Sequence, residues 1–345
     1  MSATRSTSAA RTRRLRSKII EVIASFVKQA IIQGIPLLYG STGEIITEKS
    51  GNLNLGIPGI MYIGGIAGVI GAYFYEHAVE VINPFLGVLI PFVCSVAGSM
   101  FMALIYSFLT VTLRANQNVT GLALTTFGVG VGNFFGGSLS SLFGEGGSIA
   151  LNRTGACFKA TLPFASKLGL FGETFLSFGF LAYLAIFIAL AASWFLNHTR
   201  AGLNLRAVGE SPATADAAGI NVTRYKYLAT CIGGGIAGLG GLYFIMDYIG
   251  GAWTNGGFGD RGWLAIALVI FALWKPKASI LGSILFGGLY IVYLYIPGLS
   301  RASQEIFKML PYVVTIAVLI IISIRNRREN QPPESLGLSY FREER

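Results

Sequence analysis

The chain has 345 residues, of which 53% are hydrophobic and 12% are charged, and its mean hydropathy is +0.63. Soluble domains usually carry about a quarter charged residues, so this composition excludes an ordinary soluble domain. The net charge of +10 does not indicate nucleic acid, because the basic residues flank apolar runs, a pattern typical of the cytoplasmic ends of membrane spans.

The first predicted element is a basic tail, residues 1–18. No A-x-A-like cleavage site follows it, so we interpret it as a retained cytoplasmic tail and not as a targeting peptide. Residues 19–324 are expected to form a single transmembrane domain. A second cytoplasmic tail, residues 325–345, is expected to follow the last apolar run.

Nine apolar runs follow the basic tail, most of them near the ~20 residues that cross a bilayer. They are 19–43, 59–75, 84–113, 119–143, 174–196, 227–249, 262–274, 279–297 and 306–324. Nine crossings would put the two basic termini on opposite sides. Either the first run lies in the membrane interface or a short run, such as 262–274, is re-entrant, so eight or nine spans are expected.

The sides of the loops follow from counting back from the C-terminus. The loop 197–226 and the turn Lys275–Lys277 are then cytoplasmic, and the loop 144–173 faces outward. The contrast in basic residues between the two long loops is small.

Two polar, glycine-rich breaks precede short apolar runs in the two halves of the chain, Ser50–Gly59 and Asn255–Gly262. This pattern predicts an all-α polytopic bundle with internally repeated halves and broken helices that meet near a substrate path. Two ordinary loops are the alternative. Polar, aromatic or helix-breaking residues near these breaks and span ends are the candidates for the path: Asn52, Asn54, Gly56, Pro58, Asn116, Asn118, Asp247, Trp253, Asn255 and Asp260.

Each class of these candidates has a plainer interpretation. The asparagines can satisfy loop backbone groups, and Asp247 can lie in the interface or in water, as can Glu44 and Glu48 after the first run. Trp253 can belong to the aromatic belt at the membrane surface, which we take as the stronger alternative for it.

Catalytic signatures are missing from the sequence. It has no H-E-x-x-H and no G-x-x-x-x-G-K-[ST], so the chain has no phosphate loop of its own. The match to G-x-G-x-x-G at Gly233–Gly238 lies inside an apolar run with no strand before it, and close helix packing explains it better. We expect no enzyme activity, no metal and no cofactor in this chain.

The stretch VGESPATADAAGI, residues 208–220, predicts a short helix in the cytoplasmic loop. Ser211 is a suitable N-cap, Pro212 suits the first helical position and Gly219 suits a left-handed stop. A helix of about seven residues is marginal alone, and it has no apolar stripe to pack on its own protein. Its small side chains could enter a groove on a partner; a capped surface turn is the alternative.

Three segments resemble known transporters. GEIITEKSGNLNLGIPGI, LRAVGESPATADAAGINVTRYK and GFGDRGWLAIALVIFALWKPKASILG are similar to segments of ABC importer permeases of the simple-sugar, nucleoside and branched-chain amino acid superfamily, closest to its nucleoside type. The resemblance covers about residues 20–300. In one departure from the pattern, Pro58 stands where a glutamate usually precedes the glycine.

The resemblance implies a coupling helix that docks on a separate ATP-binding subunit, where ATP and magnesium bind. The residues it assigns to this contact are Glu210, Ser211, Pro212, Ala213, Thr214, Ala215, Asp216, Ala218 and Gly219. It also implies a second, different permease subunit, an extracytoplasmic substrate-binding lipoprotein and a bacterial plasma membrane. The expected solute is a nucleoside, then a simple sugar, then a branched-chain amino acid; an ATP-independent channel is the rival from another class.

Overall fold

The computed structural model describes residues 3–142, 149–161, 169–325 and 331–341. In this part of the chain, all the regular elements are helical. The transmembrane helices are α1 (Ala3–Glu48), α2 (Ile57–Ala78), α3 (Pro84–Ser107), α4 (Gln117–Leu142), α7 (Phe180–His198), α10 (Val222–Leu242), α11 (Arg261–Phe271), α12 (Pro276–Ile291) and α14 (Leu310–Arg325). Shorter helices are α5 (Asn152–Phe158), α6 (Gly169–Phe175), α8 (Arg200–Glu210), α9 (Pro212–Ala217) and α13 (Arg301–Lys308).

Three of the long helices continue into turns of other helical types. These are the π-helical turns η1 (Phe108–Thr112) after α3 and η3 (Tyr243–Tyr248) after α10, and the 3₁₀ turn η4 (Val292–Tyr295) after α12. Eight of the described helical segments are long and apolar enough to cross a bilayer. The predicted all-α polytopic bundle is therefore confirmed.

The apolar run 262–274 forms the short helix α11. Its 11 residues rise about 16 Å at ~1.5 Å per residue, which is half of a bilayer core. The irregular residues 249–260 precede it. Within them, Trp253 donates its backbone N–H to the carbonyl oxygen of Ile149, near α5. After α11, Trp274 lies beside Glu48, the last residue of α1, at the other end of the bundle. The run 262–274 therefore forms a half-length helix after an irregular segment, and whether this run crosses the bilayer or is re-entrant stays a prediction.

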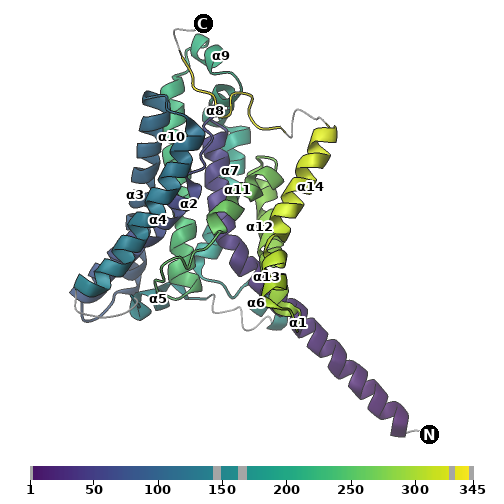
Figure 1. Cartoon of the computed structure of the whole chain (residues 1–345). Coiled ribbons are helices and arrows are strands. Elements are labelled where there is room, and N and C mark those ends of the chain that lie inside the picture. The colour runs from purple at the N-terminus through teal and green to yellow at the C-terminus, as the bar shows by residue number, and fades with distance from the viewer. Residues whose placement is uncertain (1–2, 143–148, 162–168, 326–330, 342–345) are drawn as a thin grey trace.

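The first apolar run crosses the bundle as well. α1 is half buried among the other helices, so the interfacial interpretation of this run is also wrong. In Figure 1 the chain enters near α13 and ends near α9, at opposite ends of the bundle. α1 begins at Ala3 with no break at residue 18, and the cytoplasmic placement of the two tails stays a prediction.

The two halves of the chain repeat the same packing. α1 packs against α11 and α12, just as α10 packs against α2 and α3. Likewise α2 contacts α4, and α11 contacts α14. α1 and α10 themselves are antiparallel neighbours: Asn52 bonds Thr230 near the start of α10, and Pro36 lies opposite Gly240 near its end. Such matched contacts are those of two repeats of opposite orientation.

Glycine allows the central helices to approach closely. A Cβ on Gly64 of α2 would lie 2.5 Å from the carbonyl oxygen of Gly238 on α10, and one on Gly128 of α4 would lie 2.7 Å from Cα of Gly59 on α2. These contacts confirm that the glycine spacing serves helix packing.

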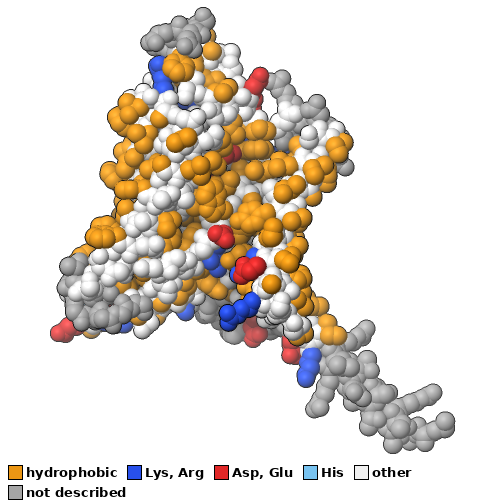
Figure 2. Space-filling view, in the orientation of Figure 1, with side chains coloured by type: hydrophobic (Ala, Val, Ile, Leu, Met, Phe, Trp, Pro, Cys, Tyr) orange, Lys and Arg blue, Asp and Glu red, His pale blue; other side chains and the backbone are white. Residues whose placement is uncertain are grey.

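The flanks of the bundle are apolar. Large exposed side chains on the outer helices include Phe85, Phe101, Phe134, Ile316 and Ile320. Figure 2 shows hydrophobic side chains over most of the visible flank. A surface of this kind is suited to lipid and not to water.

Candidate functional site

The two predicted breaks meet inside the bundle. The first, residues 49–56, joins α1 to α2, and the second, residues 249–260, joins η3 to α11. Pro58 and Gly262, each the second residue of its helix, are in contact: a Cβ on Gly262 would lie 2.6 Å from Cβ of Pro58. The N-terminal ends of two short helices therefore converge, and such ends attract anionic or electron-rich groups.

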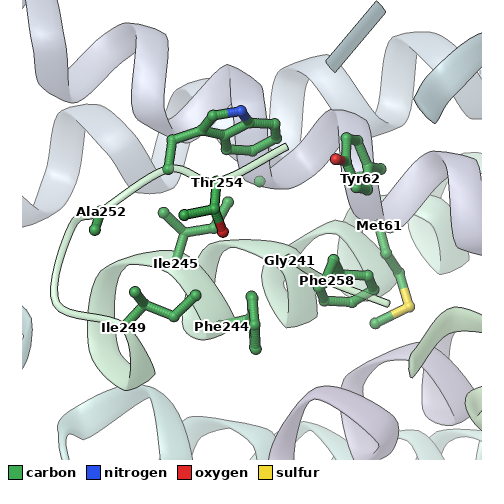
Figure 3. A pocket seen from close by; sticks show the side chains of 11 residues that line it. Met61, Tyr62, Gly241, Phe244, Ile245, Ile249, Ala252, Thr254 and Phe258 are labelled. Atoms are coloured by element: carbon green, nitrogen blue, oxygen red, sulfur yellow. The ribbon is translucent and has the colours of Figure 1, made fainter. Parts of the chain in front are cut away.

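Aromatic side chains close the space beside this contact. Tyr62 on α2 packs edge-on against Trp253 and Phe258 of the second break, with ring centroids 5.3 and 6.4 Å apart (Figure 3). The Tyr62 hydroxyl donates to Asn133 Oδ1 at 2.5 Å and accepts from the backbone N–H of Gly256 at 2.8 Å. These contacts join α2, α4 and the second break.

The cavity that remains between these side chains is closed to solute. Its volume is about 10 Å³, close to the ~10–15 Å³ that one water molecule requires. Pockets that hold small organic ligands measure ~300–1,000 Å³. The structure is therefore a conformation in which the two breaks are shut against each other.

Buried amides line the first break. Asn52 is fully buried and donates Nδ2–H to Thr230 Oγ1 at 3.0 Å. Asn54 is also buried; its Oδ1 accepts from the N–H of Gly56 at 2.9 Å, and its own N–H donates to Glu44 Oε1 at 3.1 Å. Asn52 Oδ1, Asn54 Nδ2 and Glu44 Oε2 have no hydrogen-bond partner in the described structure, which is unusual for buried polar atoms and more common at functional sites.

Two carboxylates of α1 lie beside these amides. Glu44 and Glu48, one helical turn apart, are 0% and 3% exposed, so placement in the interface or in water is wrong for both. Glu48 accepts a hydrogen bond from Trp274 Nε1, which follows α11. Sequence reasoning missed this link between the two halves; the i, i+4 spacing of the glutamates before the break was the available signal.

Lys49 continues the same turn toward the coupling region. Burial lowers the pKa of its ammonium group, and the nearby carboxylate of Glu210 acts in the opposite direction. Its backbone oxygen lies against Gly209 of α8. The first break is therefore in direct contact with the helix that leads to α9.

Three of the predicted path residues, Asn116, Asn118 and Asp247, lie outside the two breaks. Asn116 and Asn118 are exposed near the start of α4, where Asn116 Oδ1 accepts from the N–H of Val119. Asp260, the last residue of the second break, is exposed. Asp247 lines a separate cavity of about 280 Å³ together with Lys159, and its Oδ2 is buried without a partner.

Trp253 and Asn255 lie in the second break itself. Trp253 is 4% exposed, so the interpretation as an interfacial belt residue is wrong for it. Its Nε1–H donates to Asn255 Oδ1 at 2.9 Å. The indole lies over Gly136 of α4, where a Cβ would collide with the ring.

The predicted cytoplasmic helix is α9. Ser211 is its N-cap and accepts from the N–H of Thr214, Pro212 is its first residue, and Gly219 has a φ of +82°. Its packing differs from the expectation. Ala215 is 3% exposed and packs with Val208 and Val222, so α9 does rest on its own protein.

The opposite face of α9 is free. Exposed small residues form it: Ala213, Thr214, Ala217 and Ala218. Glu210 before the helix and Gly219 after it are exposed too, whereas Asp216 is half-buried. The structure therefore presents a narrow surface of small side chains beyond α8, at the end of the bundle opposite α13 (Figure 1).

Comparison with known proteins places this fold in a family. The family described as branched-chain amino acid transport system / permease component matches residues 26–319. A putative glucose ABC transporter permease of Haloferax volcanii is 34% identical over 89% of this chain and 94% of its own length. A nucleoside ABC transporter permease of Lactococcus lactis is 31% identical over 88% and 93%, and a guanosine ABC transporter permease of Bacillus subtilis is 27% identical over 87% and 92%.

A bundle of broken, inverted repeats with closed breaks at its centre is the architecture of a transport protein. The chain belongs to the branched-chain amino acid transport system permease family and is an ABC transporter permease. Proteins of this kind are transport components and not enzymes. The relatives and the membrane-spanning helices also confirm a multi-pass protein of the bacterial plasma membrane.

Proposed function

We propose that this chain imports a nucleoside or a related purine or pyrimidine solute by alternating access, driven by a separate ATP-binding subunit that docks on α9. The contact between the two breaks is the observation that carries the transport mechanism. A solute can pass only if Pro58 and Gly262 separate and the aromatic closure around Tyr62 opens, because the cavity there holds about one water molecule.

The free energy for this opening comes from the partner subunit through its contact with α9. The sequence has no phosphate loop, whereas α9 offers exposed small side chains on a capped helix. ATP and magnesium are therefore assigned to the partner subunit, and a secreted lipoprotein and a second permease complete the proposed assembly. An ATP-independent channel would leave the free face of α9 unexplained.

The solute assignment rests on two of the relatives, whose names give nucleoside and guanosine transport. A simple sugar is the second candidate, because the relative from Haloferax volcanii is named a putative glucose permease. The buried amides Asn52 and Asn54 can pair with the donors and acceptors of a base, but they also suit sugar hydroxyls.

An exposed residue of α9 provides the test of docking. In cells that express the whole transporter, Ala213→Trp is expected to reduce uptake of labelled guanosine at least about tenfold by blocking the partner's groove, as hot-spot contacts imply. Ala191→Trp, at an exposed position of α7, is the control and should transport normally. Full uptake by Ala213→Trp would contradict docking at α9, and uptake without ATP would favour the channel.

Competition identifies the solute class. Excess unlabelled uridine should suppress guanosine uptake, and glucose and leucine should not. Suppression by glucose alone, with no guanosine uptake, would move the assignment to the sugar class.

A further inference from the structure

The segment after the last membrane helix folds back onto the end of the bundle. The sequence suggests only a tail there, but residues 335–341, called here the C-terminal strap, lie over α8 and α9, as the yellow trace near the C label shows (Figure 1). Ser335 is 7% exposed, and Tyr340 packs against the cluster of Val208, Ala215 and Val222. The strap is therefore part of the folded domain.

One end of the strap is fixed to the turn before α9 and to the first break. Ser335 donates both its N–H and its hydroxyl to the carbonyl oxygen of Gly209, at 3.1 and 2.5 Å. Gly337 donates its N–H to Gly51 O at 3.2 Å. The same few residues thus hold the end of α8 and the break between α1 and α2 together.

The middle of the strap reaches α4. Gln117 donates Nε2–H to Leu338 O at 3.4 Å, while its Oε1 accepts from the N–H of Leu53 at 2.7 Å. The Arg114 guanidinium lies 4.6 Å from the ring centre of Phe341. Gln117 therefore connects the strap to the first break a second time.

The far end of the strap holds α9. The Tyr340 hydroxyl donates to Asp216 Oδ2 at 2.9 Å, a hydrogen bond to a charged group and so one of the stronger kind. A six-residue helix is not stable by itself. The strap, through Tyr340, and the packing of Ala215 on Val208 and Val222 stabilise this helix.

We propose that the C-terminal strap positions the docking helix α9 and links it mechanically to the first break, with Ser335 and Tyr340 as positioning residues. This inference rests on the proposed function, because it concerns how movement of an ATP-binding partner reaches the transport path. Displacement of α9 is transmitted through Tyr340 and the strap to Gly51 and Leu53, the backbone that borders the buried amides. The partner subunit meets α9 with the strap already in place.

The first measurement needs no partner. Hydrogen–deuterium exchange of the amides in 213–219 is compared between the purified full chain, Tyr340→Phe and a chain ending at Glu334. Loss of the hydrogen bond to Asp216 should speed exchange about tenfold, the population change that one charged hydrogen bond implies, and loss of the strap should speed it further. Ser339→Ala, for which no side-chain hydrogen bond is found in the described structure, is the matched control.

The second measurement uses the complete transporter. Tyr340→Phe should retain the ATP-binding subunit during purification but transport less solute per ATP hydrolysed, because α9 still docks but transmits less movement. Asp216→Asn keeps an acceptor for the tyrosine and should transport better than Asp216→Ala. The double variant Tyr340→Phe/Asp216→Ala should lose no more than Asp216→Ala alone, as a shared contact requires.

The outcomes separate the two proposals. Unchanged exchange in both Tyr340→Phe and the shortened chain would overturn the strap's role, as would normal transport per ATP in both. If exchange rises but the unaltered transporter shows no ATP-dependent uptake, the strap still positions α9 and the proposed ATP-driven function is the part that fails.

Discussion

The buried carboxylate of Glu48 shows how one residue can hold the two repeats together. It belongs to α1, and its donor, Trp274, follows α11 in the second half of the chain. Leu273 and Trp274 have φ values of 55° and 54°, a region that costs energy for residues with a side chain. The hydrogen bond offsets part of this cost and satisfies an oxygen that lies away from water.

Trp274→Phe is expected to destabilise the chain. The substitution keeps an aromatic ring but leaves the Glu48 carboxyl without its donor, at a cost of about 1–3 kcal/mol. This loss of stability is measured as a lower midpoint temperature in thermal unfolding of the purified protein. Trp194→Phe, at a tryptophan that is 61% exposed, is the control; equal midpoints for the two variants would show that the bond to Glu48 contributes nothing.

Residue patterns alone could predict part of the site. Asn52, Asn54 and Pro58 stood out because they lie in a polar, glycine-rich break directly before a short apolar run. Burial separated Asn52 and Asn54 from Asn116 and Asn118, and no sequence property distinguishes these pairs, since all four lie next to span ends.

At the scale of helices, small residues decide which helices touch. Gly64 on α2 faces Gly238 on α10, backbone against backbone. The glycine motifs predicted that helices pack closely, but not which helices pack together. Each motif marks one face of one helix and does not identify the helix that packs against that face.

Gly64→Ala is expected to impair folding or transport. The added methyl group would lie 2.5 Å from Gly238 O, and overpacking of this kind costs about 1–3 kcal/mol. Gly130→Ala on α4 is the matched control, since a Cβ there meets nothing within 4 Å. The yield of folded protein and solute uptake are measured for both; a normal Gly64→Ala protein would show that the contact between α2 and α10 relaxes readily.

The helix α9 illustrates the limits of local reasoning. Its cap and stop were predicted correctly because they depend on neighbouring residues only. Its contacts depend on Val208, Val222 and Tyr340, and the last of these is more than 100 residues away. A bulky substitution at Ala215, which is 3% exposed, would disrupt this packing, so the exposed Ala213 is the better probe of docking.

At the scale of the whole molecule, the fold is a pair of inverted repeats shut at their breaks. Under the proposed alternating access, opening would separate α2 from α11 and move Phe258 away from Tyr62. Packed interfaces of this kind switch between arrangements and do not deform gradually.

Phe258→Cys reports this opening. The side chain is 5% exposed in the closed conformation, so a thiol there should react slowly with maleimide when Cys94, Cys157 and Cys231 are replaced by serine. Addition of ATP to the complete transporter should raise the labelling rate roughly tenfold or more if the open state is a minor one at rest. Val81→Cys, at a position 84% exposed, should label equally fast with and without ATP.

The sequence by itself determined the class of the protein: membrane insertion, the approximate positions of the long apolar helices, the two breaks and the caps of α9. All of these follow from hydropathy and from interactions between residues a few positions apart. Only the tertiary structure decided the meeting of Pro58 with Gly262, the burial of Glu44 and Glu48 and the docking of the C-terminal strap. These contacts join residues far apart in the chain, and their energy depends on desolvation and packing, which exist only once the helices are assembled.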